Sequence, residues 1–296
     1  MRKRIIGIIV IGTSLLLAGC SSRGEVKRDA SGKQVLSGYI TLSGAFALYP
    51  LAIQWADEFH RLHPDVDIDI SAGGAGKGIT DVLADQVDIA MVSRELKPQE
   101  KEKGVLAYAV AKDAVVATIN ANNPVYREWL KTGLTQKQAT AIWEGKTKMN
   151  VYTRSDACGA AETWAAFLRK KQEDLKGTGV FGDPGVAETL QKDVNGIGFN
   201  NIGYAYNDKT HKPMKGIAIV PIDVNGNGKL DAEEKFYDTL DELMDAIAKG
   251  KYPAPPARNL YLVTAGKPKN PVVVEFLKYV RTKGQRLNAP AGFVHI

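Results

Sequence analysis

The feature that most restricts the fold of this chain is a repeated unit in which a strand-like segment leads through a small-residue or polar turn into a helix. Alternating apolar residues precede each turn, and apolar residues at helical spacing follow it. Repeats of this kind predict an α/β protein with a parallel sheet, whose ligands bind beyond the carboxyl ends of the strands. The units occupy residues 38–62, 66–85 and 149–168.

The turn of the third unit, from Arg154 to Gly159, is the candidate binding site. It carries a cation, a hydroxyl, a carboxylate and a thiol immediately before a predicted helix. Unpaired backbone N–H groups and the positive end of the helix dipole make such a position attractive to an anion. We therefore expect this turn to bind a small oxyanion.

Two long apolar segments predict how the units are divided. One lies near Leu106–Asn120 and the other near Leu260–Thr264, and a section with its own strand–turn–helix pattern lies between them. This arrangement predicts two lobes, with the chain crossing twice between them, that close on a ligand by a hinge motion. In the middle section, the glycine-punctuated segment from 196 to 221 is expected to return to the sheet.

The amino terminus has the features of an export signal. A cationic segment, Met1 to Arg4, is followed by an apolar segment too short to span a bilayer and then by Leu17-Ala18-Gly19-Cys20. This predicts a bacterial lipoprotein signal at residues 1–19, a lipid on the Cys20 thiol and a flexible tether at 20–34. An ordinary signal peptide with a chance cysteine is the alternative. Either way the protein is expected outside the cytoplasm.

Charge and cysteine content narrow the function classes. The formal net charge is +6, and it falls to about +3 without the leader's cations, too little to indicate a nucleic-acid partner. The chain has two cysteines. With Cys20 carrying the lipid, Cys158 has no disulfide partner and lies in the candidate turn.

The motifs, taken in order, resemble one family, the phosphate-binding proteins of bacterial phosphate ABC importers. The resemblance covers the chain from about Val35 to the carboxyl terminus, apart from a segment near 223–234. It rests on the order of the motifs rather than on any single one. The motifs are Ser43-Gly44 with Tyr49-Pro50, Gly73 to Gly78, Asp88 to Leu96, Leu134-Thr135 with Ile142 to Lys146, Gly196 to Phe199 with Gly203 to Tyr206, and Arg258 to Pro268.

This resemblance implies a type II periplasmic-binding-protein fold with two lobes and two hinge crossovers. Lobe 1 would comprise residues 35–112 and 258–296, and lobe 2 residues 113–257. The implied function is that of a lipid-anchored receptor, not an enzyme, which captures inorganic phosphate and delivers it to a membrane permease. We expect a monomer that binds no nucleic acid.

The resemblance also implies the ligand-binding residues. Arg154, together with Ser93-Arg94 at the end of a lobe 1 strand, would line the site, and the two arginines would supply charge and fork-shaped donors. Asp156 would accept a hydrogen bond from the protonated oxygen of phosphate, which sulfate lacks; helix capping is its alternative role. Backbone N–H groups would replace hydroxyl donors, because Cys158 and Ala160 stand where the family has serine and threonine. These N–H groups would come from Ala47-Leu48, Ala75-Gly76 and Cys158-Gly159.

The segment from Asp223 to Glu234 fits the twelve-residue calcium-loop pattern. Gly228 would permit the sharp bend, and a helix starting at Glu234 is expected to follow. We expect a structural calcium ion here, with a chance Asn/Gly turn as the alternative. The metal ligands would be Asp223, Asn225, Asn227, the Lys229 carbonyl, Asp231 and Glu234.

Three other functions compete with phosphate capture. The missing hydroxyl donors leave open a receptor of the same fold for sulfate, molybdate or tungstate. A secreted hydrolase using the Cys158 thiol is a second alternative, although no histidine lies near it in sequence. A phosphate sensor that signals to a membrane partner is the third.

Overall fold

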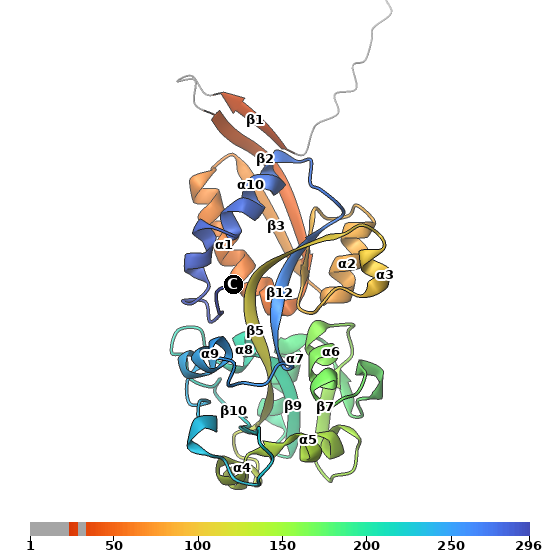
Figure 1. Ribbon diagram of the computed structural model, residues 1–296, viewed down its shortest axis with the longest axis vertical. Coiled ribbons are helices and arrows are strands. Elements are labelled where there is room, and N and C mark those ends of the chain that lie inside the picture. The colour runs from red at the N-terminus through yellow and green to blue at the C-terminus, as the bar shows by residue number, and fades with distance from the viewer. Residues whose placement is uncertain (1–23, 29–33) are drawn as a thin grey trace, which may run out of the picture.

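The computed structural model describes residues 24–28 and 34–296. The elements form two lobes stacked along the long axis, with β5 and β12 running between them (Figure 1). Each lobe has its own hydrophobic cluster, one centred on Trp55 and Phe276 and the other on Trp143 and Trp164. The predicted Cys20 and the leader lie outside the described residues. Among the described residues, no helix is long and apolar enough to cross a membrane.

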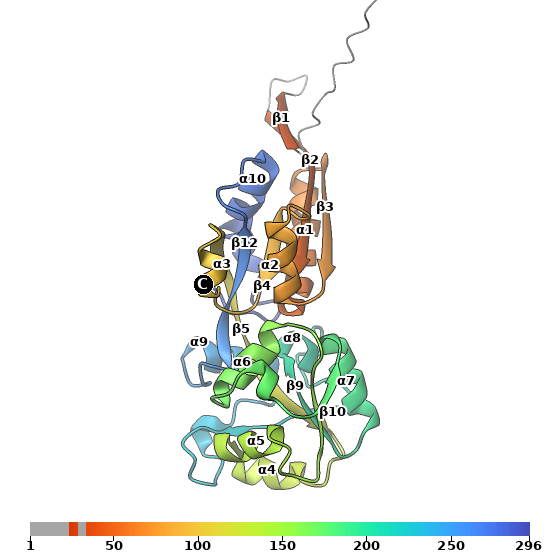
Figure 2. The same ribbon diagram turned by 90° about the vertical axis from the view of Figure 1, so that its right-hand side faces the viewer.

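Lobe 1 is built from the first two strand–turn–helix units, and its helices cover both faces of its sheet (Figure 2). Pro50 lies in the first turn of α1, where its fixed φ suits the helix. The strands of lobe 1 are β1 (Gly24–Arg28), β2 (Gln34–Gly44), β3 (Val66–Ala72), β4 (Ile89–Val92) and most of β12 (Ala257–Thr264). Its helices are η1 (Phe46–Leu48), α1 (Tyr49–Leu62), α2 (Ala75–Leu83), α3 (Pro98–Lys101), α10 (Pro271–Val280) and η4 (Lys283–Leu287).

Lobe 2 contains the third unit and the calcium-loop segment. Thr135 caps α5 through a capping box with Gln138. The strands of lobe 2 are the second half of β5 (Leu106–Asn120), β6 (Leu134–Thr135), β7 (Asn150–Arg154), β8 (Thr178–Val180), β9 (Gly196–Asn201), β10 (Ile217–Ile219) and β11 (Ile222–Asp223). Its helices are α4 (Tyr126–Thr132), α5 (Gln136–Trp143), α6 (Gly159–Phe167), η2 (Gln172–Asp174), α7 (Gly182–Lys192), α8 (Ile202–Ala205), η3 (Ala232–Glu234) and α9 (Leu240–Ala248).

One sheet runs through both lobes in the order β1-β2-β4-β12-β5-β9-β7-β8, with β3 paired to β2 and β10 to β5. The strands of the repeated units pair in parallel, as predicted: β2 with β3 and β4, and β7 with β8 and β9. The crossing strands β5 and β12 pair antiparallel with each other and with their neighbours. The two crossings are therefore the central pair of a continuous mixed sheet.

Three local predictions are wrong. Residues 24–28 of the expected tether form strand β1, which pairs with β2. Backbone hydrogen bonds to β2 hold this polar segment in place, although it has few apolar residues to bury. Residues 202–205 form α8 instead of a strand. The expected helix at Glu234 begins only at Leu240, where Thr239 provides the cap, and a short 3₁₀ turn ends the loop instead.

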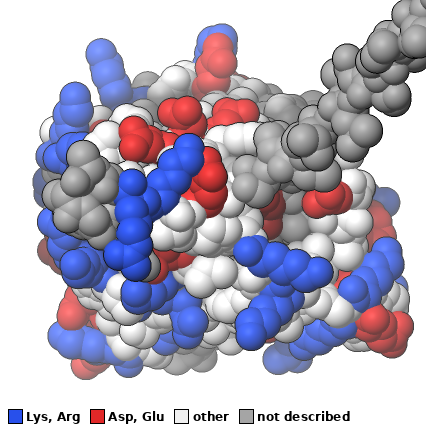
Figure 3. All heavy atoms as spheres, turned by 90° about the horizontal axis from the view of Figure 1, so that it is seen from above, with Lys and Arg blue, Asp and Glu red and all other residues white. Residues whose placement is uncertain are grey.

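The end of lobe 1 seen in Figure 3 carries positive and negative side chains interspersed among neutral ones. Interspersed charges of both signs largely cancel each other's field at a distance.

Candidate functional site

The turn of the third unit begins at the carboxyl end of β7 and leads into α6. Cys158 has extended backbone angles and occupies the cap position, and its Sγ accepts the Ala161 N–H at 3.5 Å. The cap role that was an alternative for Asp156 thus falls to the cysteine. Burial raises the pKa of the Cys158 thiol to about 12, so the thiol stays neutral at physiological pH.

Arg154 and Asp156 form a buried fork-to-fork pair inside this turn. Arg154 Nε donates to Asp156 Oδ1 at 2.8 Å and Nη2 donates to Oδ2 at 2.6 Å. The Arg154 side chain is fully buried. The Gly182 N–H also donates to Asp156 Oδ1, at 3.2 Å. Since both partners are held by two parallel bonds, their orientation is fixed.

Asp183, at the start of α7, is a second carboxylate on the same arginine and was missed in the sequence analysis. Arg154 Nη1 donates to Asp183 Oδ2 at 2.6 Å, and Asp183 is completely buried. Burial alone lowers the pKa of the Arg154 guanidinium, but Asp183, Cys158 and Asp156 together outweigh it and raise that pKa. The arginine is permanently charged, and its charge is balanced by protein carboxylates.

The glycine-rich turn of lobe 1 lies directly against this turn of lobe 2. The Gly76 N–H donates to the Ala157 carbonyl across the interface at 3.2 Å. A Cβ on Gly74 would lie 2.8 Å from the Ala157 carbonyl and 3.1 Å from Asp156 Oδ2. Only a residue without a side chain permits this approach, and Asp156 Oδ2 faces the opposite lobe.

Ser93 and Gly159 form a second close contact between the lobes. A Cβ on Gly159 would lie 2.3 Å from Ser93 Oγ and 2.4 Å from the Ser93 carbonyl. The structure therefore brings the predicted Ala75, Gly76 and Ser93 of lobe 1 up to the predicted Cys158 and Gly159 of lobe 2. The amino termini of α2 and α6 face this junction.

The turn that contains η1 contributes an aromatic ring to the site in addition to the expected backbone donors. Ala47 and Leu48 are buried in η1. Their neighbour Phe46, which the sequence analysis did not select, stacks on the guanidinium of Arg154 at 5.4 Å from the ring centroid. The Tyr204 hydroxyl of lobe 2 donates to the Phe46 carbonyl at 3.2 Å. This ring covers one face of the arginine.

Arg94 is turned away from the junction and holds the lobes together from the side. Its Nη1 and Nη2 donate to Glu100 at 2.8 and 2.7 Å, and its Nε lies 2.9 Å from Glu162 Oε2 of α6. Lys97 Nζ lies 2.9 Å from Glu162 Oε1. Arg94 thus contacts carboxylates of both lobes, and it occupies the position of an interlobe latch rather than that of the expected ligand donor.

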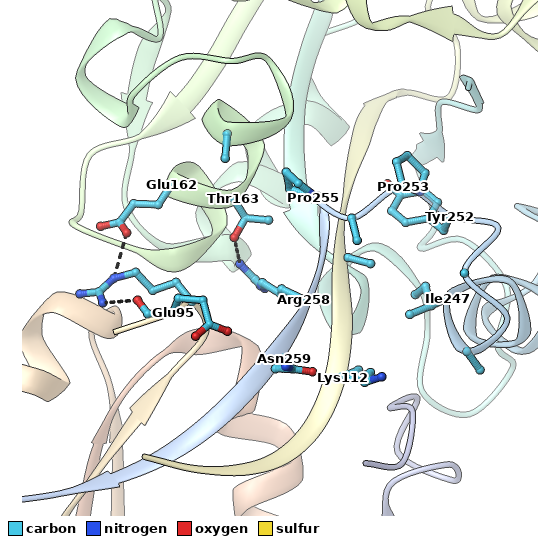
Figure 4. Close-up of a pocket in the computed structure, with 16 residues that line it drawn as sticks. Glu95, Lys112, Glu162, Thr163, Ile247, Tyr252, Pro253, Pro255, Arg258 and Asn259 are labelled. Atoms are coloured by element: carbon cyan, nitrogen blue, oxygen red, sulfur yellow. Dashed lines mark hydrogen bonds and ion pairs between the residues drawn. The ribbon is translucent and has the colours of Figure 1, made fainter. Parts of the chain in front are cut away.

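A cavity of about 770 Å³ lies beside this latch, along the crossing strands (Figure 4). Glu162 and Thr163 of α6 line it from lobe 2, and Arg258 of β12 projects toward Thr163. Arg258 Nη1 donates to Thr163 Oγ1 at 3.1 Å. The cavity gives solvent access to the side of α6, next to the junction.

In the predicted calcium loop the polar groups bond to the loop itself. Asp223 accepts the N–H groups of Gly226 and Gly228 at 2.6 and 2.7 Å, and Glu234 Oε1 accepts the Val224 N–H at 2.8 Å. Gly228 has the positive φ that the sharp bend requires. Asn225 and Asn227 both donate to Asp231 Oδ2. Among the described residues, no group of three or more His, Cys, Asp or Glu side chains is arranged to hold a metal ion.

Several curated proteins that are named as phosphate-binding proteins are similar in sequence to this chain. A phosphate-binding protein PstS of Staphylococcus epidermidis is 24% identical over 310 residues, which is 99% of this chain and 89% of that protein. The PstS of Bacillus subtilis is 26% identical over 222 residues, or 70% of this chain and 73% of its own.

Solved structures show the same fold. A Clostridium perfringens protein assigned as a phosphate ABC transporter substrate-binding protein, with bound phosphate, superposes with a TM-score of 0.71 at 21% identity, covering 88% of this chain and all of that one. An ABC-type phosphate transport receptor from Vibrio cholerae gives a TM-score of 0.63 at 20% identity, covering 87% of this chain and all of its own. The predicted type II periplasmic-binding-protein fold is confirmed. The profile of the PBP superfamily domain (PBP_like_2) matches residues 29–283, and the chain belongs to this family.

Proposed function

We propose that this protein captures inorganic phosphate between its two lobes and passes it to the membrane permease of an ABC importer. The observation that carries the proposal is the junction at which the amino termini of α2 and α6 meet beside the buried Arg154. Backbone N–H groups at helix amino termini bind anions without needing hydroxyl side chains. Relatives named as phosphate-binding proteins support this ligand.

Asp156 gives the site its proposed selectivity for phosphate. Its Oδ2 accepts one bond from Arg154 and faces Gly74 of lobe 1, so this oxygen retains acceptor capacity toward the junction. A phosphate that carries a proton donates to such an acceptor, whereas sulfate has no proton and would meet an unpaired like charge. Sulfate, molybdate and tungstate remain the alternative ligands, favoured by the methyl group of Ala160 and the neutral thiol of Cys158, which replace two hydroxyl donors.

The test is calorimetry of the full chain in detergent with phosphate, sulfate and molybdate at neutral pH. We expect phosphate to bind and the other two to bind at least ten-fold more weakly. Asp156→Asn should reduce this preference by about ten-fold, the value of one charge-assisted hydrogen bond. Failure of the wild-type protein to bind phosphate would end the proposal, and tight molybdate binding would favour the alternative.

Binding without chemistry is part of the proposal. A hydrolase would need a nucleophilic thiolate, and burial holds the pKa of Cys158 near 12 instead. We also propose that the protein is a monomer, anchored outside the cytoplasm by a lipid on Cys20. Incorporation of a labelled fatty acid that is lost in Cys20→Ser would support the anchor, and labelling that persists in the variant would contradict it.

We further propose that the loop from Asp223 to Glu234 binds a structural calcium ion. Oxygen atoms of Asp223, Asn225, Asn227, Asp231 and Glu234, with the Lys229 carbonyl, would hold the ion. The positive φ of Gly228 and the buried Leu230 support the loop geometry. The sequence pattern is the main support, since the side chains bond within the loop.

Calcium at about 100 times its Kd should stabilise the fold by about 2.7 kcal/mol, which corresponds to several degrees in melting temperature. The measurement is the melting temperature with calcium and with chelator. Glu234→Gln should lose most of this difference. Glu233→Gln is the matched control, because Glu233 is exposed and adjacent. A melting temperature that does not respond to chelator would remove the site.

A further inference from the structure

A chain of buried polar side chains leads from Asp183 away from the ligand junction. Asp183 Oδ2 accepts Asn201 Nδ2 at 2.7 Å, and Asp183 Oδ1 accepts the Asn201 N–H at 2.8 Å. Asn201 stands at the end of β9 and is almost completely buried. Every polar atom of the Asp183 carboxylate is thus held either by Arg154 or by Asn201.

Asn201 in turn bonds to Arg258 on β12. Arg258 Nη2 donates to Asn201 Oδ1. Its Nη1 donates to Thr163 Oγ1 of α6, as Figure 4 shows. Its Nε donates to Asp113 Oδ1 of β5 at 2.8 Å. One guanidinium therefore joins both crossing strands to the helix that carries the candidate turn.

The position of Arg258 in the sheet places its contact with Asp113 between the two lobes. Arg258 and Asp113 are paired residues of the β12–β5 ladder. β12 pairs with β4 of lobe 1 from Tyr261 onward, and β5 pairs with β9 of lobe 2 from Val115 onward. The Arg258–Asp113 pair thus lies between the part of the ladder fixed to lobe 1 and the part fixed to lobe 2, where a hinge bends.

We propose that Arg258 is a positioning residue for the ligand site, acting on Arg154 through Asn201 and Asp183 and linking the site to the hinge strands. This inference rests on the proposed function for its effect on phosphate, but the relay itself consists of hydrogen bonds between side chains of this protein. Buried hydrogen-bonded networks fix the orientation of the groups that they contain. A change of angle at the hinge pair shifts Asn201 and Asp183, and with them the only basic side chain at the junction turn.

Substitutions at two positions interrupt the relay that runs from Arg258 through Asn201 and Asp183 to Arg154. Asn201→Ala removes the link and leaves the Arg258–Asp113 pair, and Arg258→Gln removes the charge at the hinge. Arg258→Lys keeps the positive charge but loses the two-pronged hydrogen bonding of the guanidinium. This variant tests the relay if Arg258→Gln does not fold. Arg286→Gln is the matched control, because Arg286 is an exposed arginine that pairs with Glu58 within lobe 1.

The first measurement needs no ligand. The Gly182 N–H donates to Asp156, so its hydrogen exchange reports the orientation of the Arg154–Asp156 pair. We expect exchange at Gly182 to become about ten-fold faster in Asn201→Ala and in the Arg258 variants, because a less restrained Asp156 lets the Gly182 hydrogen bond open more often. Exchange at Gly73, which donates within lobe 1, and the Arg286→Gln protein should be unchanged.

The second measurement is the Kd for phosphate in a double-mutant cycle. Arg258→Gln should weaken binding about ten-fold in the wild type and less than two-fold in an Arg154→Gln background, because its effect passes through Arg154. Unchanged Gly182 exchange in the relay variants, or effects of Arg154 and Arg258 that multiply independently, would overturn the inference. If the wild type binds no phosphate, the proposed function fails, and the exchange measurement alone decides the relay.

Discussion

Gly159→Ala is the sharpest test of whether the two lobes meet at the candidate site as the structure shows. Gly159 is the first residue of α6 and does not have a positive φ, so alanine suits its backbone. The added Cβ would lie 2.3 Å from Ser93 Oγ, 2.4 Å from the Ser93 carbonyl oxygen and 2.8 Å from the carbonyl carbon. All of these atoms belong to lobe 1. The substitution therefore leaves lobe 2 intact and obstructs only closure.

The size of the effect follows from this overlap. Ordinary contact begins near 3.4 Å, so the lobes must separate by about 1 Å, and the carbonyl cannot rotate aside. Overpacking of this kind costs about 1–3 kcal/mol, which the protein can avoid only by opening. Because each 1.4 kcal/mol is a factor of ten, the Kd for phosphate should rise about 5- to 150-fold. The melting temperature without ligand should not fall, since alanine is the better helix former.

Titration calorimetry measures the Kd, and small-angle scattering measures the separation of the lobes with phosphate present. Gly203→Ala is the matched control, because no atom lies within 4 Å of the added Cβ and the residue is in lobe 2. We expect this control to bind phosphate as the wild type does. A Gly159→Ala protein with wild-type affinity would show that ligand binding does not require the Ser93–Gly159 contact, and the reasoning would fail.

Two further predictions concern the latch and the thiol. Glu162→Gln removes the pairs with Arg94 and Lys97 and should weaken phosphate binding about five-fold, or about 1 kcal/mol for a partly exposed pair. The loss should shrink when the ionic strength rises from about 0.01 to 1 M, and a salt-independent loss would contradict an ionic latch. For the thiol, burial raises the pKa of Cys158 in the folded protein from about 9 to about 12. The neutral thiol therefore contributes its full stability below the unfolded-state pKa, near 9, and this contribution declines as the pH rises toward 12. Chemical denaturation measures the free energy of unfolding, which should differ between wild type and Cys158→Ala by a constant amount up to about pH 8. Above pH 9 the wild type should lose up to about 1.4 kcal/mol more than the variant per pH unit. Free energies that stay parallel up to pH 11 would disprove this burial.

The sequence predicted the structural features that depend on residues close together in the chain. Hydrophobic periodicity located the parallel units, and the two long apolar segments indicated two lobes with two crossings between them. The capping box at Thr135 is a signal of the same kind, because its partner Gln138 lies three residues away. Such short-range signals fix which segments become strands or helices and where anions can approach a helix terminus.

Tertiary structure decided which distant groups meet these segments. Arg154 fits an anion-binding turn in the sequence, but its balance by Asp183, its cover by Phe46 and its connection to Arg258 come from α7, η1 and β12. Strand β1 forms for the same reason, since its bonding partners are in β2. The pattern of apolar and polar residues does not specify which distant side chains meet, because burial and electrostatic compensation are set by elements packed together in space. The sequence by itself determined the α/β units and the polar turn for which we propose anion binding. Only the packing of the two lobes decided that Asp183 balances the charge of Arg154 in this turn and that the turn lies against lobe 1.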